Sequence, residues 1–127
     1  MSKKVITCST APSAIGTYSQ AISVGNFVFI SGQIPLNYKD MTVISGSFEE
    51  QVETVMSNIK NIALEADCSI NDCVKFTVYL KDLENFVAVN TVMDKHLLKP
   101  YPARAAVEVS RLPKDVEIEI DAILFKQ

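Results

Sequence analysis

Histidine and cysteine are scarce in this 127-residue chain, and tryptophan is missing altogether. The one histidine, His96, argues against a histidine-based metal site and against a Ser-His-Asp catalytic triad. The three cysteines, Cys8, Cys68 and Cys73, are odd in number, and the last two fit no common zinc spacing. We therefore expect no metal site, and reduced thiols as in a cytoplasmic protein.

Long apolar runs and a strong charge of either sign are also missing. The longest wholly apolar stretches are short, such as residues 27–30, so we expect no membrane-spanning segment. Residues 1–8 are positively charged but lack the apolar region that a secretory signal needs. Lys and Arg number 12 and Asp and Glu 15, a net charge of −3 that argues against a nucleic-acid partner without excluding a local basic pocket.

Two segments carry the apolar spacing of amphipathic helices. In the first, apolar residues recur at alternating steps of four and three, and Ser47 with Glu50 forms a capping-box signature. The second begins after Asp82, a residue suited to the N-cap, and ends before Pro100, because the residue preceding a proline is pushed out of the helical region. The stripes are Phe48, Val52, Val55, Ile59, Ile62 and Ala66 in the first helix and Phe86, Val89, Met93 and Leu97 in the second.

The remaining apolar residues alternate with polar ones over short segments, as in β-strands. We expect strands at 5–8, 74–80, 103–109 and 116–124, and a hairpin of 21–24 and 27–31 that turns at Gly25 and Asn26. The predicted order is β-β-β-α-β-α-β-β. Since each helix has one apolar stripe to bury, we expect an α+β fold in a single domain spanning 1–127, with both helices on one face of a mixed β-sheet.

The last predicted strand places three carboxylates, Glu117, Glu119 and Asp121, on one face. The preceding strand carries Arg104, and the short connection between these strands suits an antiparallel return. Arg104 would then lie across from the middle of the acidic strand. One interpretation is a surface ion-pair ladder, worth about 0–1 kcal/mol. The other is a pocket in which Arg104 clamps a small carboxylate ligand and a neighbouring carboxylate is a general base towards water.

The predicted strand at 27–31 is apolar on both faces, because Val28 and Ile30 alternate with Phe27 and Phe29. The two helices cover one face of the sheet. We therefore expect a second copy of the chain to cover the other face, since large exposed apolar patches usually mark interfaces. The alternative cover is the long loop 35–47.

Four further residues suit a binding site, although each has an ordinary structural alternative. Ser31 and Gly32 could offer a hydroxyl and a backbone N–H to an anion, or simply form a turn. Tyr18 could project its hydroxyl, or pack half-buried. Asn90 lies in phase with Phe86 and Met93 on the second helix, so we expect it to face inward and to need a partner there. His96, near the end of that helix, is expected to interact with the helix dipole.

Three sequence blocks are the most distinctive of the chain: residues 102–122, which include Arg104 and Glu119, residues 15–21 and residues 29–35. In these blocks, and over nearly its whole length, the chain resembles the reactive intermediate deaminase A (RidA) family, also called YjgF/YER057c/UK114. The resemblance implies a chorismate-mutase-like, RidA-like α+β fold. It also implies a homotrimer whose ligand sites lie in the clefts between subunits.

The function implied by this resemblance is the hydrolysis of 2-imino acids to 2-keto acids and ammonia. Such imines are reactive products of pyridoxal-phosphate-dependent dehydratases. The resemblance implies that Arg104 clamps the substrate carboxylate and that Glu119 positions or activates the attacking water. An imine carbon is already electrophilic, so the reaction calls for no cofactor and no metal. The pocket is expected to be lined by Tyr18, Ser31, Gly32, Asn90 and Ala106.

The chain departs from the family pattern at several positions near the expected pocket. Thr17 stands beside Tyr18 where proline is frequent. Ala106 stands where many members have cysteine, and we expect it to contribute mainly backbone contacts. Met93 and Leu97 replace aromatic residues of the second helix, which would change the substrate side chain that fits.

Two other functions stay open. The same cleft could bind a small carboxylate in a non-catalytic regulatory protein, whose trimer would contact a partner protein. RNA cleavage, an activity attached to relatives in this family, is disfavoured by the acidic net charge, the single histidine and the lack of a basic stripe.

Overall fold

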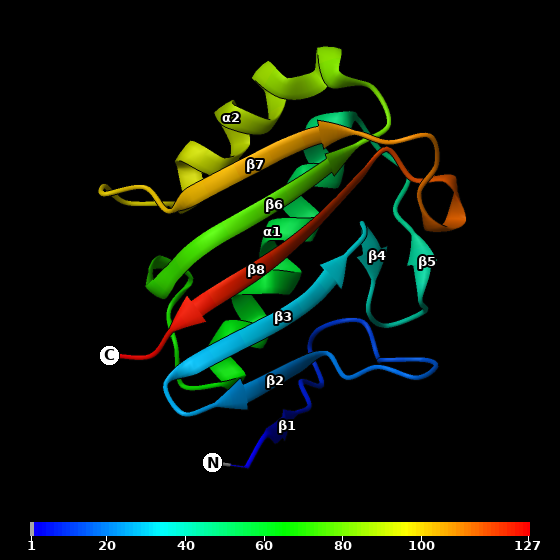
Figure 1. The fold of residues 1–127 in the computed structure, drawn as a ribbon. Coiled ribbons are helices and arrows are strands. Elements are labelled where there is room, and N and C mark those ends of the chain that lie inside the picture. The colour runs from blue at the N-terminus through cyan, green and yellow to red at the C-terminus, as the bar shows by residue number, and fades with distance from the viewer. Residues whose placement is uncertain (1) are drawn as a thin grey trace.

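The computed structural model describes residues 2–127. It contains a six-stranded sheet with two helices on one of its faces (Figure 1). The predicted α+β fold, with both helices over one face of a mixed sheet, is confirmed. The helices are α1 (Phe48–Glu65) and α2 (Phe86–His96). The strands of the sheet are β1 (Lys4–Ile6), β2 (Ala21–Val24), β3 (Phe27–Gln33), β6 (Cys73–Leu80), β7 (Ala103–Glu108) and β8 (Ile118–Phe125).

Several short elements were not predicted from the sequence. A small hairpin of β4 (Leu36–Asn37) and β5 (Thr42–Val43) forms within the expected loop 35–47. Three single turns of 3₁₀-helix, η1 (Ile70–Asp72), η2 (Leu83–Asn85) and η3 (Pro113–Asp115), connect larger elements. Within the described residues, no helix has the length and apolar character needed to cross a membrane.

Helix α1 begins at the predicted capping box. The Ser47 hydroxyl accepts the backbone N–H of Glu50 at 3.2 Å, and the Glu50 carboxylate accepts the backbone N–H of Ser47 at 3.0 Å. A cap of this kind contributes about 1 kcal/mol to helix stability. Beyond it the predicted apolar stripe faces the sheet and is fully buried at Val52, Val55, Ile59 and Ile62.

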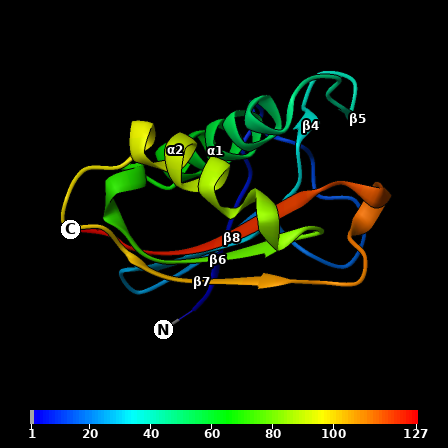
Figure 2. The ribbon, with the colours of Figure 1, turned by 90° about the horizontal axis from the view of Figure 1, so that it is seen from above.

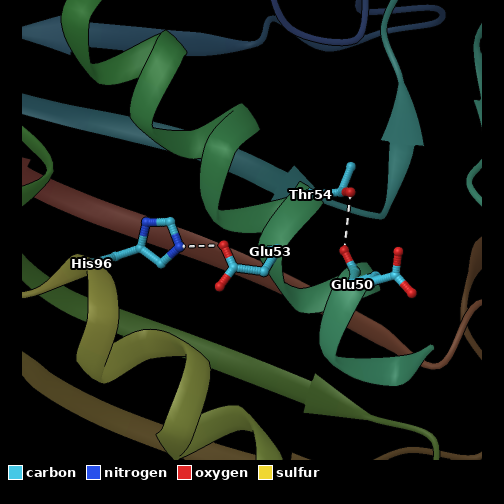
Figure 3. A network of polar contacts seen from close by, with 4 residues as sticks. All are labelled: Glu50, Glu53, Thr54 and His96. Carbon is cyan, nitrogen blue, oxygen red and sulfur yellow. Dashed lines mark hydrogen bonds and ion pairs between the residues drawn. The ribbon is translucent and has the colours of Figure 1, made fainter. Parts of the chain in front are cut away.

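Helix α2 is shorter than predicted at both ends. Asp82 is a cap, but of the turn η2, where its carboxylate accepts the backbone N–H of Glu84 at 2.9 Å. Leu97 is buried, yet it lies in extended backbone just beyond the helix. His96 occupies the last turn, where the helix dipole favours a cation. It also joins the two helices, because its Nε2 lies 2.8 Å from Oε2 of Glu53 on α1 (Figure 3).

The two C-terminal strands do not pair with each other, so the predicted antiparallel return is wrong. β8 lies between β3 and β6 and is antiparallel to both, whereas β7 is the parallel outer neighbour of β6. Burial explains this order. Ile118, Ile120, Ala122 and Leu124 of β8 are at most 2% exposed, which suits a central strand, while no residue of β7 is fully buried, which suits an edge. Helix α2 lies in the crossover that the parallel β6–β7 pair requires.

The face of the sheet away from the helices is uncovered in the single chain (Figure 2). We call it the open face. Its aromatic end is made of Phe27, Phe29 and Phe125, which are 44%, 45% and 37% exposed. Phe27 packs edge-on against Phe125 with ring centroids 5.1 Å apart. The open face also carries Tyr79 on β6 and Glu119 and Asp121 on β8.

Loop 35–47, the alternative cover for this face, does not lie over it. The loop folds into the β4–β5 hairpin at one end of the sheet, on the side of α1 (Figure 2). There the Asn58 amide of α1 donates a hydrogen bond to the Leu36 carbonyl at 3.0 Å. The alternative is therefore wrong, and the open face keeps an apolar patch of the kind that marks interfaces.

Candidate functional site

The Arg104 guanidinium is fixed on the helix side of the sheet. Arg104 pairs in register with Phe76, a fully buried residue whose side chain faces the helices. Its side chain therefore extends along α2, where Nη1 donates a hydrogen bond to Oδ1 of Asn90 at 2.6 Å. The guanidinium also stacks over the Phe86 ring, 4.7 Å from the ring centroid. Two contacts from one helix thus orient the cation while leaving it exposed.

A cavity of about 640 Å³ opens beside this guanidinium, and we call it the Arg104 cavity. Phe76, Met93 and Leu97 give it an apolar wall. Its polar rim includes Asn90 and the pair Asp94 and Tyr101. The Tyr101 hydroxyl donates a hydrogen bond to the Asp94 carboxylate, and this bond raises the pKa of Tyr101. An apolar wall with a few fixed polar groups is typical of small-molecule sites.

Glu119 lies on the opposite side of the sheet. It pairs in register with Tyr79, which is out of phase with Phe76 on the same strand. Its half-buried carboxylate contacts the β3 backbone so closely that a Cβ added at Gly32 would lie 2.0 Å from Oε2. Burial, followed by the negative charge of Asp121, raises the pKa of Glu119. A carboxyl group with a raised pKa is a stronger proton acceptor once it is ionised.

The β3 backbone is irregular at Ser31 and Gly32, where the pairing with β8 shifts between Ile30 and Gln33. The Ser31 hydroxyl donates a hydrogen bond to the Ser19 carbonyl at 2.5 Å, and the Ser31 N–H donates to the Gln20 carbonyl at 2.9 Å. The Ser31 side chain therefore ties β3 to the loop before β2. The Ser31 hydroxyl proton is therefore already used within the chain, rather than offered to an anion as expected.

Tyr18 projects from a loop that the buried side chain of Gln20 holds in place. The Gln20 amide accepts the Cys8 N–H at 2.6 Å and donates to the carbonyls of Cys8 and Pro12 at 3.0 and 2.7 Å. Tyr18 itself is 51% exposed. Together with Gly32 and Glu119 it lines a second cavity of about 480 Å³, which we call the Glu119 cavity.

The predicted site is therefore divided within one chain. Arg104 and Asn90 line one cavity, while Tyr18, Gly32 and Glu119 line the other, and the two cavities share no lining residue. The expectation that Arg104 and the carboxylates share one sheet face is wrong, because it depended on β7 pairing with β8.

Three further predicted residues, Ser31, Glu117 and Ala106, fall outside both cavities. Glu117 precedes β8 and is exposed, so the expected row of three carboxylates reduces to Glu119 and Asp121. Ala106 is half-buried on β7 and packs against the core. Its side chain lines neither the Arg104 cavity nor the Glu119 cavity.

Sequence reasoning missed three contributors to these cavities. Phe86 was assigned to the apolar stripe alone, although its ring supports the Arg104 guanidinium. The contact between Asp94 and Tyr101 was not foreseen. The available signal was the spacing of Asn90 and Asp94, four residues apart on one helix face.

The three cysteines are buried and unpaired with one another. Burial raises the pKa of Cys73 to about 12, and burial also raises the pKa of Cys68. Neither thiol is therefore a ready nucleophile at neutral pH. Among residues 2–127, no three His, Cys, Asp or Glu side chains come together in a group that could hold a metal ion.

Comparisons with known proteins match the chain to a known family over nearly its whole length. The family model described as "Endoribonuclease L-PSP" matches residues 8–125. A RutC family protein of Pyrococcus abyssi is 52% identical over 127 residues, covering 100% of both chains. A protein of Dermatophagoides farinae named 2-iminobutanoate/2-iminopropanoate deaminase is 34% identical over 122 residues, covering 96% of this chain and 95% of that protein.

Solved structures share both the fold and much of the sequence. RidA from an Antarctic Psychrobacter species superposes with a TM-score of 0.93 at 48% identity, covering 96% of this chain and 98% of that one. TdcF from E. coli, solved with bound serine, superposes with a TM-score of 0.90 at 39% identity, covering 98% and 99% of the two chains.

Proposed function

This chain belongs to the endoribonuclease L-PSP family, to which RidA and RutC family proteins also belong, and we propose that it is a 2-iminobutanoate/2-iminopropanoate deaminase. Acting as one domain spanning 1–127, it would hydrolyse small 2-imino acids to 2-keto acids and ammonia. The observation that carries the proposal is the Arg104 guanidinium, oriented by Asn90 and Phe86 beside a cavity with an apolar wall. A fixed guanidinium suits a ligand carboxylate, and the wall suits a short apolar side chain.

The complete site would form between two copies of the chain. Arg104 and Glu119 point away from opposite faces of the same sheet, so one ligand cannot reach both within a chain. The open face offers an apolar surface on which another copy can pack, including Phe27, Phe29 and Phe125. A homotrimer would place the Arg104 cavity of each copy against the Glu119 cavity of its neighbour.

Each residue type then has a chemical task. Arg104, oriented by Asn90, would hold the substrate carboxylate through paired N–H donors. Glu119 would accept a proton from the attacking water, which its raised pKa favours. Tyr18 and Gly32, which line the Glu119 cavity, would surround the imine, and Ser31 would contribute its backbone beside Gly32. Ala106 would contribute its backbone, since its side chain packs against the core.

The proposed reaction balances without a further reactant. Water adds its oxygen to the protonated imine carbon, the C=N electron pair moves to nitrogen, and Glu119 takes a proton from the water. Glu119 returns this proton to the nitrogen of the resulting carbinolamine. As the C–N bond breaks, the hydroxyl proton passes through Glu119 to the leaving ammonia. The products are a 2-keto acid and an ammonium ion, and Glu119 is ionised again.

The test is a coupled assay in which threonine dehydratase generates the imine and the release of 2-ketobutyrate is followed. The protein should accelerate release above the uncatalysed rate. Arg104→Ala should reduce the rate acceleration by at least about 30-fold, because it removes the charged partner of the substrate carboxylate. Arg111→Ala is the matched control, since Arg111 is an exposed arginine paired with Asp115 at 2.8 Å. Full acceleration by a folded Arg104→Ala protein would overturn the role of Arg104.

A non-catalytic, carboxylate-binding regulatory protein is the second candidate. The observation in its favour is that Arg104, Asn90 and the apolar wall suffice to bind a carboxylate without Glu119. The structural neighbour TdcF, solved with bound serine, supports such a ligand class. Glu119→Gln separates the two functions: an enzyme keeps affinity for a 2-keto acid and loses turnover, whereas a binding protein has no turnover to lose.

We place the protein in the cytoplasm, because three free cysteines suit a reducing compartment. RNA cleavage, suggested by the family description, is disfavoured by the net charge of −3. Degradation of RNA by the purified protein, and not by Arg104→Ala, would favour it instead.

A further inference from the structure

A second carboxylate accompanies Glu119 on the open face. Asp121 lies two residues further along β8, so its side chain points to the same side of the sheet. Two residues of an extended strand span about 7 Å, which brings the two charges within interacting distance. Both side chains are half-buried, so water screens their repulsion only in part. The reaction described above assigns no task to Asp121.

Tyr79 fixes the position of Asp121. It sits directly opposite Glu119 in the pairing of β6 with β8, and its hydroxyl reaches diagonally to Asp121, where it donates a hydrogen bond to Oδ2 at 3.0 Å. Burial, together with Asp121 and then Glu119, raises the pKa of Tyr79, so its hydroxyl keeps the proton that it donates. The three side chains form one cluster across β6 and β8.

We infer that Asp121, held in place by the Tyr79 hydroxyl, is a positioning residue for the proposed function: its negative charge makes the Glu119 carboxylate a stronger proton acceptor. This inference rests on the proposed role of Glu119. It differs from that role because Asp121 does not line the Glu119 cavity and would act through Glu119. A like charge nearby disfavours the ionised form of a carboxylic acid, and an acid that ionises less readily binds a proton more tightly.

Other charged or titratable groups near Glu119 do not account for this effect. Tyr18 and Lys114 line the same cavity, from the loop before β2 and from η3, and the neighbouring β3 contributes Gly32, which carries no charge. Of the charged side chains around it, Asp121 is the one whose charge raises the pKa of Glu119. In the proposed trimer, Arg104 of the neighbouring copy also faces the site. Arg104 is unchanged in every variant proposed to test this inference.

The inference predicts pH shifts of opposite sign for two variants. Asp121→Asn removes the repelling charge, so the acidic limb of the kcat/KM profile should move to lower pH. Its plateau should fall by less than about tenfold, well short of the loss of about 10²-fold or more that follows removal of a general base. Tyr79→Phe removes the donor that partly neutralises Asp121, so the acidic limb should move to higher pH. A purely packing role for either residue would lower the plateau without moving the limb.

The experiment combines this rate profile with a ¹³C NMR titration of the Glu119 side-chain carboxyl in the whole assembled protein. Thr77→Val is the matched control, because Thr77 lies directly opposite Asp121 in register and carries no charge. Thr77→Val should change neither the pH profile of kcat/KM nor the NMR titration curve of Glu119. Asp121→Asn should move both to lower pH, and a Glu119 titration that stays in place or moves upward overturns the inference. If the wild-type protein shows no deaminase activity, the proposed function fails, while the NMR titration still decides whether Asp121 controls the protonation of Glu119.

Discussion

Gly32 and Glu119 approach each other so closely that a side chain at position 32 would displace the Glu119 carboxylate. A Cβ added to Gly32 would lie 2.0 Å from Oε2 of Glu119 and 2.9 Å from its Cδ. The Glu119 carboxylate can therefore occupy this position because Gly32, on the neighbouring strand β3, has no side chain. A glycine in the middle of a strand weakens it, so its presence here suits a close approach.

Gly32→Ala should displace the Glu119 carboxylate and reduce imine hydrolysis by about 10²-fold, because small displacements of a catalytic group are costly. Crowding should also lower the free energy of unfolding by about 1–3 kcal/mol. The coupled assay and urea unfolding measure the two effects. Gly46→Ala is the control: its new methyl group would lie 3.1 Å from the Glu50 carboxylate of the α1 cap, so it should lower stability but leave hydrolysis unchanged. Undiminished hydrolysis by Gly32→Ala would contradict the role of Glu119.

Glu119→Gln should stabilise the protein at neutral pH. The pKa of Glu119 is raised above its ordinary value of 4.5, so the folded protein binds more protons than the unfolded chain between the two pKa values. Wild-type stability should therefore fall as pH rises above about 4.5 and stay lower beyond the folded pKa. The glutamine variant lacks this dependence. Urea unfolding at pH 4 and pH 8, at one protein concentration, should show a gain for the variant at pH 8 alone.

Asn90→Ala should weaken substrate binding more than it slows turnover. The variant removes the Oδ1 acceptor that lies 2.6 Å from Arg104 Nη1, so the guanidinium loses one of its two supports. A hydrogen bond to a charged group contributes about 1.5–3 kcal/mol, which corresponds to a loss in kcat/KM of roughly 10- to 100-fold. The loss should fall mainly on KM. Lys95→Ala, at an exposed position of the same helix, should leave both constants unchanged.

Phe29→Glu should separate the copies. The variant places a charge on the open face, where Phe29 is 45% exposed in the single chain. Burying an unpaired charge in an apolar interface is strongly unfavourable, so the trimer should give way to monomers. Analytical ultracentrifugation measures this change. Leu64→Glu is the control, because Leu64 is 57% exposed on the helix layer. A trimer that persists in Phe29→Glu would exclude the open face as the interface.

Two inactive variants should restore each other when mixed. Arg104→Ala retains the Glu119 cavity, and Glu119→Gln retains the Arg104 cavity. In a mixed trimer, some interfaces combine the intact half of each chain. Co-refolding the two proteins should therefore recover activity that neither has alone. Mixtures that stay inactive although mass spectrometry shows mixed trimers would refute a site shared between copies.

Local signals in the sequence predicted the helices and strands well. The capping box at Ser47 and Glu50 located the start of α1, and the alternation at 27–31 indicated a strand with two apolar faces. The order of the strands was harder to predict. A short connection between 103–109 and 116–124 favours a hairpin, yet the fully apolar inner face of β8 takes the centre of the sheet. Burying the whole apolar face of a strand outweighs the preference for a short connection. Which strand takes the centre of the sheet depends on the apolar faces of all the other strands, so it cannot be predicted from one connection.

The candidate site could be predicted residue by residue, but its geometry could not. Arg104, Asn90 and Phe86 meet because the crossover from β6 to β7 sets α2 over the edge strand. The separation of Arg104 from Glu119 follows from the same crossover. Ser31 was expected to offer its hydroxyl to a ligand, but that hydroxyl bonds the Ser19 carbonyl instead. Such choices among nearby acceptors depend on loop geometry that the sequence pattern does not encode.

The open face has a consequence for a newly made chain. In the single chain, Phe27, Phe29 and Phe125 are exposed to water, and in the proposed assembly another copy would pack on them. A monomeric chain would thus lack a complete site and would also expose an aromatic surface that is prone to non-specific association. In the proposed assembly, loss of activity and exposure to chaperones or proteases would begin together, and the onset of both would depend on how many chains the cell contains.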